Sequence, residues 1–164
     1  MNVDRAAPGR GQESVWDYPR PPLAELVHRT ARVVLGGVVI AETDAPVKVM
    51  ETSHPPVYYF PAEDVRLDLF RSSPHRTHCE YKGTAHYYHV LAYDLEVKNA
   101  AWYYPEPTPS YEILRDCVAF YPQLMDECKL DDEVVEPQPG HFYGGWITSE
   151  VVGPFKGETG TLGW

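Results

Sequence analysis

The sequence predicts a mainly β protein, with one antiparallel domain folded as a pseudo-barrel or as a tent of two sheets and with a few short helices. Three observations support this prediction. The chain has 16 prolines and 12 tyrosines among 164 residues, and proline breaks helices whereas tyrosine favours strands. Short apolar or alternating runs recur along the sequence. Turn residues, mainly glycine and proline, separate these runs.

The N-terminal residues divide into an arm and the start of the domain. Residues 1–12 mix glycine, proline and charge with almost nothing to bury, so we expect a flexible arm. The single β domain is expected to span 13–164. It opens with "ESVWDYPRPP", in which Trp16, Tyr18 and Arg20 alternate before a proline pair that keeps the backbone extended.

The next segments predict consecutive strands. In "ARVVLGGVVIAETD" (31–44), two β-branched runs flank Gly-Gly, which is the pattern of a hairpin. "VKVMETS" (47–53) alternates with the period of a strand, and "VYYFP" (57–61) is a further strand that ends at a proline.

Two short helices and three more strands are predicted after residue 61. Near-helical spacing predicts a helix over 62–73, and "SYEILRDC" (110–117) predicts a second helix or a turn. Two strands are predicted within 87–105, joined around Asp94 to Asn99, and one over 118–122.

The C-terminal part has a different composition. Residues 123–140 are acidic and contain prolines, so we expect a surface connection, and 153–164 are expected to form an extended Gly-rich tail. Segments 58–69 and 102–114 both run from two aromatic residues through proline into an amphipathic stretch. Two related sheet halves would produce this similarity, and so would chance in a chain rich in tyrosine and proline.

Charge and composition argue against several classes of partner. The formal net charge is −10, and no basic run could follow a phosphate backbone, so we expect neither nucleic acid nor an anionic membrane surface as partner. No apolar stretch approaches the roughly 20 residues of a membrane span. The N-terminus lacks the apolar core of a secretory signal. Three widely spaced cysteines do not form a disulfide framework, which favours a cytoplasmic location.

The stretch "HCEYKGTAHYYHV" (78–90) holds groups that could bind a metal. His78, Cys79, His86 and His89 carry nitrogen and sulfur ligands of the kind zinc takes. Strand alternation, however, places the last two histidines on opposite faces, and the chain has no CxxC pair. We therefore expect no metal and no cofactor.

Cys79 and Lys82 also have the form of a nucleophile with a neighbouring cation that could lower its pKa. Free cysteine is among the most often buried residue types, which favours a thiol buried in a strand instead. We interpret the stretch as a turn at "KG" that leads into a strand with alternating tyrosines.

Glu51 and Lys82 are predicted to form a polar clasp. Glu51 shares a strand face with Val47 and Val49, and a charge directed into a core is costly unless it is paired. Lys82, just before Gly83, could be that partner. A structural salt bridge, or two surface charges at strand ends, would explain the same residues.

Five phrases together resemble a known family: "ESVWDYPRPP", "VMETSHPPVYYFPAEDV", "CEYKGTAHYY", "AAWYYPEP" and "VAFYP". They are similar to the bacterial and fungal domain of unknown function family 427, over about Glu13 to Tyr121. The resemblance implies a mainly β domain with a pocket and carries no established reaction. Some classifications give the family a nucleotidyltransferase-like name. The chain shows no carboxylate cluster beside a phosphate-binding loop to support that name, since Asp131 and Asp132 lie in the acidic connection.

The function predicted from these residues is the binding of a small ligand in an aromatic pocket, by a monomer or a homodimer. Pocket walls are mostly apolar with a few placed polar groups. The ligand-binding candidates are Trp16, Tyr18, Arg20, Glu51, Tyr59, Lys82, Tyr88 and Trp102. One alternative is an enzyme with Glu51 as acid/base and Lys82 stabilising an anion. The other is a structural or interaction domain with a fully packed interior.

Overall fold

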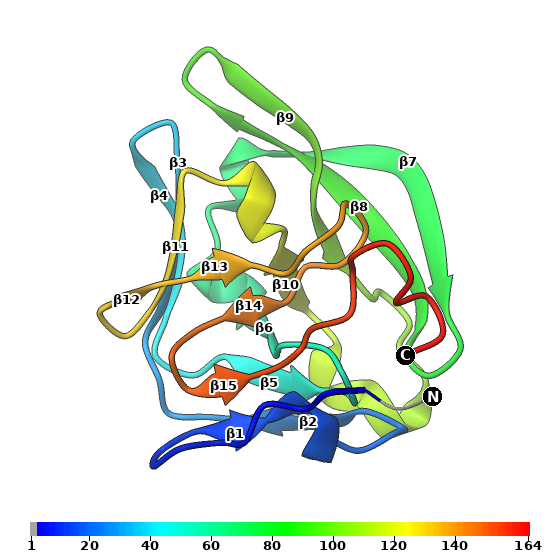
Figure 1. The fold of residues 1–164 in the computed structure, drawn as a ribbon. Coiled ribbons are helices and arrows are strands. Elements are labelled where there is room, and N and C mark those ends of the chain that lie inside the picture. Colours follow the sequence, from blue (N-terminus) through cyan, green and yellow to red (C-terminus); the bar gives the residue numbers. More distant parts are fainter. Residues whose placement is uncertain (1–2) are drawn as a thin grey trace.

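The computed structural model describes residues 3–164, and its largest element is an antiparallel sheet of seven strands (Figure 1). Their order in the sheet is β2 (Leu23–Leu26), β5 (Val47–Met50), β6 (Val57–Pro61), β10 (Cys117–Phe120), β9 (Leu95–Tyr103), β8 (Gly83–Ala92) and β7 (Phe70–Cys79). Strands β2 and β7 are the two edges, so this sheet is open and does not close into a barrel.

Three smaller sheets complete the strand framework. The four-stranded sheet has the order β12 (Glu133–Val134), β11 (Glu127–Leu130), β3 (Ala31–Leu35) and β4 (Val38–Thr43). The two-stranded sheets pair β1 (Glu13–Ser14) with β15 (Val151–Val152) in parallel, and β13 (Glu136–Pro137) with β14 (Trp146–Ile147) in antiparallel orientation. The predicted mainly β class is confirmed, and the open sheets correspond to the two-sheet alternative.

The helical segments are single 3-10 turns or a merged pair of turns. They are η1 (Val15–Asp17), η2 (Ala62–Asp64), η3 (Leu67–Leu69), η4 (Pro109–Leu114) and η5 (Pro122–Leu124). Within residues 3–164, no helix has the length and the apolar character that crossing a bilayer requires.

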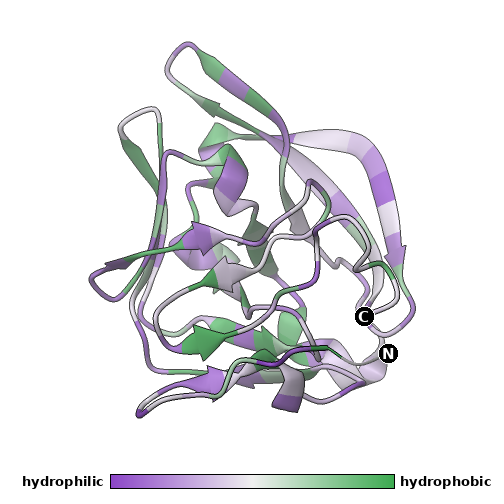
Figure 2. Ribbon diagram, viewed as in Figure 1, coloured by the Kyte–Doolittle hydropathy of each residue, from purple (hydrophilic) through white to green (hydrophobic). Residues whose placement is uncertain are grey.

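One face of the seven-stranded sheet packs against the four-stranded sheet and forms the main core. Tyr58 and Phe60 of β6 and Val118 and Phe120 of β10 point to this side, where they meet aliphatic residues of β3, β4 and β11 and the buried Trp146. Because side chains alternate along a strand, the intervening residues point to the other face. The central strand β10 is hydrophobic throughout, β8 and β9 contain both hydrophobic and hydrophilic residues, and the edge strand β7 is mostly hydrophilic (Figure 2).

The opposite face of the same sheet carries a second, more aromatic cluster. Tyr59 of β6, Tyr87 of β8 and Trp102 of β9 point to this side, together with Tyr121, which follows β10. The turn η4 covers part of it through the buried Tyr111 and Leu114. The two clusters are thus separated by the backbone of one sheet.

Two sequence predictions need correction at the level of elements. The helix predicted over 62–73 is two short turns, η2 and η3, and from Phe70 the chain is already in strand β7. Strand β7 was not predicted because its residues are mostly polar, and an edge strand needs no regular apolar face. Residues 123–140 contain β11, which lies inside the four-stranded sheet with Cys128 and Leu130 buried. The charged residues alternating with them made this strand resemble a surface segment.

Other predicted elements are present near their expected positions. The hairpin over 31–44 is formed by β3 and β4 with Gly-Gly at its turn, and the two strands within 87–105 are β8 and β9. Of the arm predicted over 1–12, residues 1–2 lie outside the described residues. Ala6 donates its N–H to the carbonyl of Gly153 at 3.0 Å, and the Arg5 guanidinium lies 5.0 Å from the centre of the Trp16 ring.

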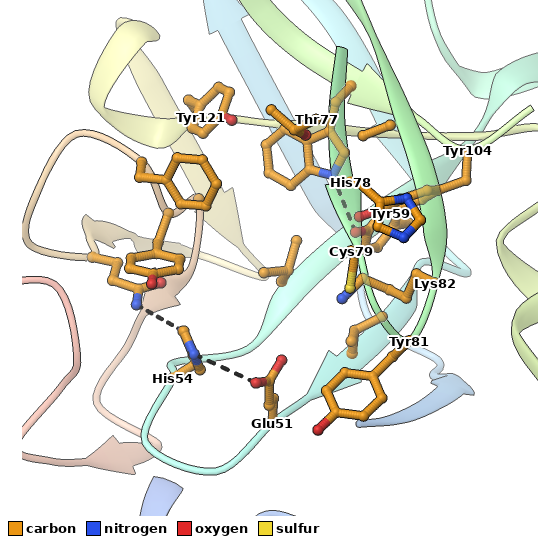
Figure 3. A pocket seen from close by; sticks show the side chains of 18 of the residues that line it. Glu51, His54, Tyr59, Thr77, His78, Cys79, Tyr81, Lys82, Tyr104 and Tyr121 are labelled. Carbon is orange, nitrogen blue, oxygen red and sulfur yellow. Dashed lines mark hydrogen bonds and ion pairs between the residues drawn. The ribbon is translucent and has the colours of Figure 1, made fainter. Parts of the chain in front are cut away.

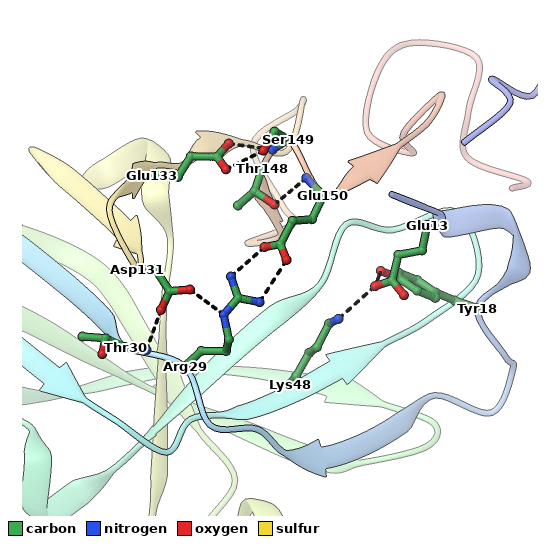
Figure 4. Close-up of polar contacts among 10 residues, drawn as sticks. All are labelled: Glu13, Tyr18, Arg29, Thr30, Lys48, Asp131, Glu133, Thr148, Ser149 and Glu150. Atoms are coloured by element: carbon green, nitrogen blue, oxygen red, sulfur yellow. Dashed lines mark hydrogen bonds and ion pairs between the residues drawn. The ribbon is translucent and has the colours of Figure 1, made fainter. Parts of the chain in front are cut away.

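The N-terminal strand β1 closes a small third cluster against the C-terminal part of the chain. Beneath its pairing with β15 lie Val15, Tyr18, Met50 and Val151, all buried. The Tyr18 hydroxyl donates to Glu13 at 2.6 Å, and Lys48 pairs with the same carboxylate at 2.9 Å (Figure 4).

A network of charges joins the four-stranded sheet to the C-terminal segment (Figure 4). Arg29 donates to Asp131 at 2.6 Å and to both oxygens of Glu150 at 3.0 and 2.7 Å. These contacts raise the pKa of Arg29, through Glu150 first, against the opposing effect of partial burial and with a further contribution from Asp131. Arg29 is therefore a fully paired cation.

Candidate functional site

The aromatic face of the seven-stranded sheet borders a cavity of about 450 Å³ (Figure 3). Strands β5 to β9 and the turn at 80–82 form one side, and the segment 138–144 forms the other. Its aromatic lining consists of Tyr59, Tyr81, Tyr87, Trp102, Tyr104, Tyr121, Phe142 and Tyr143. The charged and titratable lining residues are Glu51, His54, His78, Cys79, Glu80, Lys82 and Lys156.

The turn between β7 and β8 places Lys82 in this cavity. Gly83 follows it with φ +112°, a backbone conformation that favours glycine, and a Cβ there would approach the carbonyl of Glu106 to 3.2 Å. Thr108 holds the turn from outside, because its N–H donates to the Lys82 carbonyl at 3.1 Å and its hydroxyl donates to the Tyr81 carbonyl. The turn is therefore fixed on both sides of the lysine.

Lys82 is a buried cation, with only 9% of its surface exposed. Burial lowers its pKa, but the neighbouring groups of Tyr59, Cys79 and Glu51 more than offset this effect and the pKa is raised overall. The side chain is thus an ammonium at neutral pH. Among residues 3–164, no carboxylate is within ion-pair distance of Lys82. Its end lies beside the Cys79 sulfur (Figure 3).

Glu51 takes a different partner from the one predicted. Its carboxylate accepts from Arg20 at 3.2 Å and lies 3.7 Å from His54 Nε2. Arg20 also donates to the carbonyls of Thr52 at 2.8 Å and of Trp164 at 3.1 Å. The direct Glu51–Lys82 clasp is therefore replaced by a Glu51–Arg20 pair, although both members of the predicted clasp line the cavity.

His54 is neutral, and its hydrogen bonds define which nitrogen carries the proton. Gly145 donates to Oε1 of Gln138 at 3.0 Å, so the Gln138 amide nitrogen donates to the Lys156 carbonyl at 2.8 Å and to His54 Nδ1 at 3.0 Å. The proton of His54 is then on Nε2, which faces Glu51 (Figure 3). Burial, with smaller effects of Lys156, Arg20 and Lys82, lowers the pKa of His54 to about 3.

Phenol and indole groups hold the aromatic wall in one arrangement. Trp102 Nε1 donates to the Tyr59 hydroxyl at 3.1 Å, and the rings of Trp102 and Tyr121 lie 4.5 Å apart. The Tyr87 hydroxyl lies 2.9 Å from Thr77 Oγ1 and 3.3 Å from the Tyr121 hydroxyl. Burial raises the pKa of Tyr59 and of Tyr121, so both phenols stay neutral at neutral pH. The wall is apolar with fixed hydroxyl groups.

The opposite wall approaches the sheet closely because it contains two glycines. A Cβ at Gly144 would overlap the ring of Trp102, and one at Gly145 would overlap Gln138 Oε1 and Pro55. Lys156 lies behind this wall with its ammonium 5.6 Å from the centre of the Tyr143 ring. Phe142 is 62% exposed at the cavity edge.

Four of the eight predicted ligand-binding residues line the cavity, and a fifth bonds to one of them. Glu51, Tyr59, Lys82 and Trp102 line the cavity, and Arg20 contacts it through Glu51. The other three predicted residues lie outside the cavity.

Trp16, Tyr18 and Tyr88 are absent from the cavity lining. Trp16 donates to the Pro154 carbonyl at 2.9 Å and packs edge-on against Trp164, whereas Tyr18 belongs to the small third cluster. Tyr88 points to the main-core face, where its ring stacks on Tyr103 at 4.5 Å. Alternation from Tyr87 explains its position, since neighbours in a strand point to opposite faces.

The sequence analysis missed the residues of the opposite wall. His54, Gln138, Tyr143 and Lys156 come from loops, and nothing in their local sequence predicts that they meet. The one available signal is Gln138, a polar residue between two prolines that turns out to be 2% exposed.

The histidines considered as metal ligands have separate contacts. His89 Nδ1 accepts from the N–H of Asn99 at 3.0 Å, His86 packs edge-on against Tyr103, and His78 lies 3.2 Å from the Thr84 hydroxyl. In the part of the chain that the structure describes, no three His, Cys, Asp or Glu side chains group closely enough to hold a metal ion.

Comparison with known proteins gives one positive result. The model of a domain of unknown function (DUF427) matches residues 23–131, which is more than half of the chain. The match covers the strands of the seven-stranded sheet and the turn that carries Lys82, and it ends before the wall at 138–144. A search among curated proteins finds no match.

Proposed function

Because the chain belongs to the domain of unknown function family 427, whose description assigns no reaction, we propose a function from the cavity itself: the domain binds a small, largely planar molecule there. The observation that supports this most directly is a buried ammonium inside a cavity with aromatic walls. The volume of about 450 Å³ lies within the roughly 300–1,000 Å³ of small-molecule sites.

The aromatic groups favour a flat ligand. Tryptophan and tyrosine rings offer faces on which a planar group stacks, and the fixed hydroxyls of Tyr59 and Tyr121 orient it. A protein that used this face only for packing would fill it, as the main core does on the other side of the sheet. A cavity of this size therefore supports binding over a purely structural role.

An enzyme acting on a small molecule in the same cavity is the second candidate. Glu51 and the Nε2–H of His54 lie 3.7 Å apart at one end of the cavity, and such a pair can exchange a proton with a bound molecule. We place binding first because Glu51 is already engaged by Arg20. Product analysis after incubation with a bound molecule separates binding from turnover.

The compartment and the oligomeric state complete the proposal. Cys79, Cys117 and Cys128 are all free thiols, which fits a reducing compartment such as the cytoplasm. We propose that the domain acts there as a monomer or a homodimer, since each cavity is built from a single chain.

Cys79 provides a direct test, because it lines the cavity and is more accessible than the buried Cys117 and Cys128. A library of planar fragments is screened by ligand-observed NMR against the protein before and after Cys79 is alkylated with a bulky maleimide. We expect bound fragments to be lost on alkylation. The matched control is Cys79→Ser, which should bind the same fragments with or without the reagent.

Two results would contradict the proposal. One is the absence of any binding fragment. The other is a set of fragments whose binding is equal before and after alkylation, with intact mass confirming the modification.

A further inference from the structure

Resting on the proposed ligand-binding role, we infer that the ligand is an aryl or heteroaryl carboxylate, with its carboxylate on Lys82 and its ring against the aromatic wall. The other cations around the cavity have partners of their own. Arg20 holds Glu51, and the Lys156 ammonium lies over the ring of Tyr143. Neither lining lysine has a carboxylate within ion-pair distance in residues 3–164, and Lys82 is the buried one of the two.

The burial of Lys82 makes this missing partner significant. An exposed lysine is satisfied by water, but Lys82 is 9% exposed and is held in place by the turn at 80–82. A buried charge is stable only when it is paired and hydrogen-bonded. The neighbouring Cys79 sulfur is only a weak acceptor, so a bound anion would complete the coordination of the ammonium.

The charged residues around the cavity favour a ligand with a single negative charge. Phosphate groups are usually recognised by arginine forks or by several backbone N–H groups at once. No arginine is among the lining residues in the described chain, and Lys82 is the one buried cation among them. Glu51 and Glu80 lie nearby and would repel a more highly charged group. One ammonium matches one carboxylate.

The other lining residues indicate the chemistry of the ligand beyond its carboxylate. The rings of Tyr59, Trp102 and Tyr121 line the same cavity as Lys82, which suits a flat apolar body. His54 directs its Nε2–H to the side of Glu51, where an acceptor on the ring could also be recognised. An aromatic carboxylate combines these features in one small molecule.

The test compares probes of equal shape by isothermal titration calorimetry on the full chain: naphthoate, naphthamide, naphthyl phosphate and ATP. We expect naphthoate to bind at least about tenfold more tightly than naphthamide, the effect of one charge-assisted contact. In Lys82→Met this preference should vanish, through weaker naphthoate binding and nearly unchanged naphthamide binding. Lys82→Arg should retain part of it.

Lys129→Met is the matched control, because it removes a lysine that pairs with Glu127 at 3.7 Å and does not line the cavity. We expect it to bind both probes as the unmodified protein does. Thermal unfolding of each variant establishes that it is folded. Should Lys82→Met fail to fold, Lys82→Gln provides the same comparison.

The outcomes separate this inference from the proposed function. Equal binding of naphthoate and naphthamide, or an unchanged preference in Lys82→Met, overturns the carboxylate assignment but leaves a cavity that binds planar fragments. Tighter binding of naphthyl phosphate or ATP overturns it in favour of a phosphate ligand. Failure of all four probes also overturns it, and the alkylation experiment then decides whether the cavity binds anything.

Discussion

Tyr59 and Phe60 are neighbours in strand β6, yet they belong to two different environments. Phe60 is fully buried between the two larger sheets, where its ring packs against those of Phe120 and Trp146. Tyr59 is equally buried but borders a cavity, and its hydroxyl holds Trp102 in place. One face of the sheet is thus built for stability and the other for an arrangement of polar groups around a space.

The charged residues show the same contrast. Arg29 has about a third of its side chain exposed and contacts two carboxylates, whereas Lys82 is buried and contacts none in the described chain. Optimising stability alone would give the more buried cation the better partners. The reverse arrangement is the one that the proposed binding role of Lys82 would require, and each experiment below tests this contrast.

The largest effect is expected for Phe60→Ala. Removing a fully buried ring leaves a cavity in the main core, and such changes cost about 3–5 kcal/mol. We expect urea denaturation to show a loss of this size, with naphthoate affinity unchanged in the protein that remains folded. A loss below about 1 kcal/mol would mean that the packed face is not the source of stability.

A pH-dependent loss of stability is expected from His54. Its pKa in the folded protein is lowered to about 3, while the unfolded chain has the ordinary value near 6.5. Between these values the unfolded state binds the proton and the folded state does not. Its contribution to stability is therefore complete above about pH 6.5 and falls as the pH is lowered towards 3.

The measurement is the free energy of unfolding at pH 7 and at pH 5. We expect His54→Gln to lose about 1–2 kcal/mol less between these two values than the unmodified protein. The other six histidines are common to both proteins, so their contributions cancel in the difference. Equal pH dependence would show that His54 titrates normally in the folded state.

Arg29→Met should cost more stability than Lys82→Met. Without Arg29, the carboxylates of Asp131 and Glu150 remain, but they are 50% and 42% exposed, so water limits the loss to about 1 kcal/mol. Lys82→Met removes a buried charge and should leave the stability equal or higher. Chemical denaturation of both variants in parallel measures their free energies of unfolding. A larger loss of stability in Lys82→Met than in Arg29→Met would contradict the contrast between the two cations.

The smallest effect is expected for Tyr121→Phe. The Tyr87 hydroxyl would lose a long contact of 3.3 Å but keep Thr77 at 2.9 Å, so the change should remain within about 0.5 kcal/mol. If the fixed hydroxyls orient the ligand, the same variant should alter the affinity for naphthols more than that for naphthoate. A stability loss like that of Phe60→Ala would erase the distinction between the two faces.

Much of the framework could be predicted because it depends on local patterns. The apolar and aromatic runs "VYYFP" and "VAFYP" predict the strands β6 and β10, and the Gly-Gly pair predicts the hairpin of β3 and β4. Strands with polar or charged alternation, β7 and β11, were missed because hydrophobicity alone does not distinguish an edge strand from a loop.

The site was predictable only where it lies on strands or in the turn that joins β7 to β8. Tyr59, Lys82 and Trp102 belong to segments with recognisable patterns, and they line the cavity. The contact between His54 and Gln138 joins residues 84 positions apart, and the pairing of Arg20 with Glu51 depends on how two loops meet. Such contacts follow from tertiary packing, which the local sequence does not indicate.

The parallel pairing of β1 with β15 has a consequence for the order of events during synthesis. Glu13 lies opposite Val151, so the contact order of this pair is among the highest the chain allows. While the ribosome is still adding the intervening residues, the nascent chain has no partner for β1, and Val15 and Met50 stay uncovered. The cluster beneath β1 is therefore completed only after residue 151 has left the exit tunnel, which makes its closure a late step of folding.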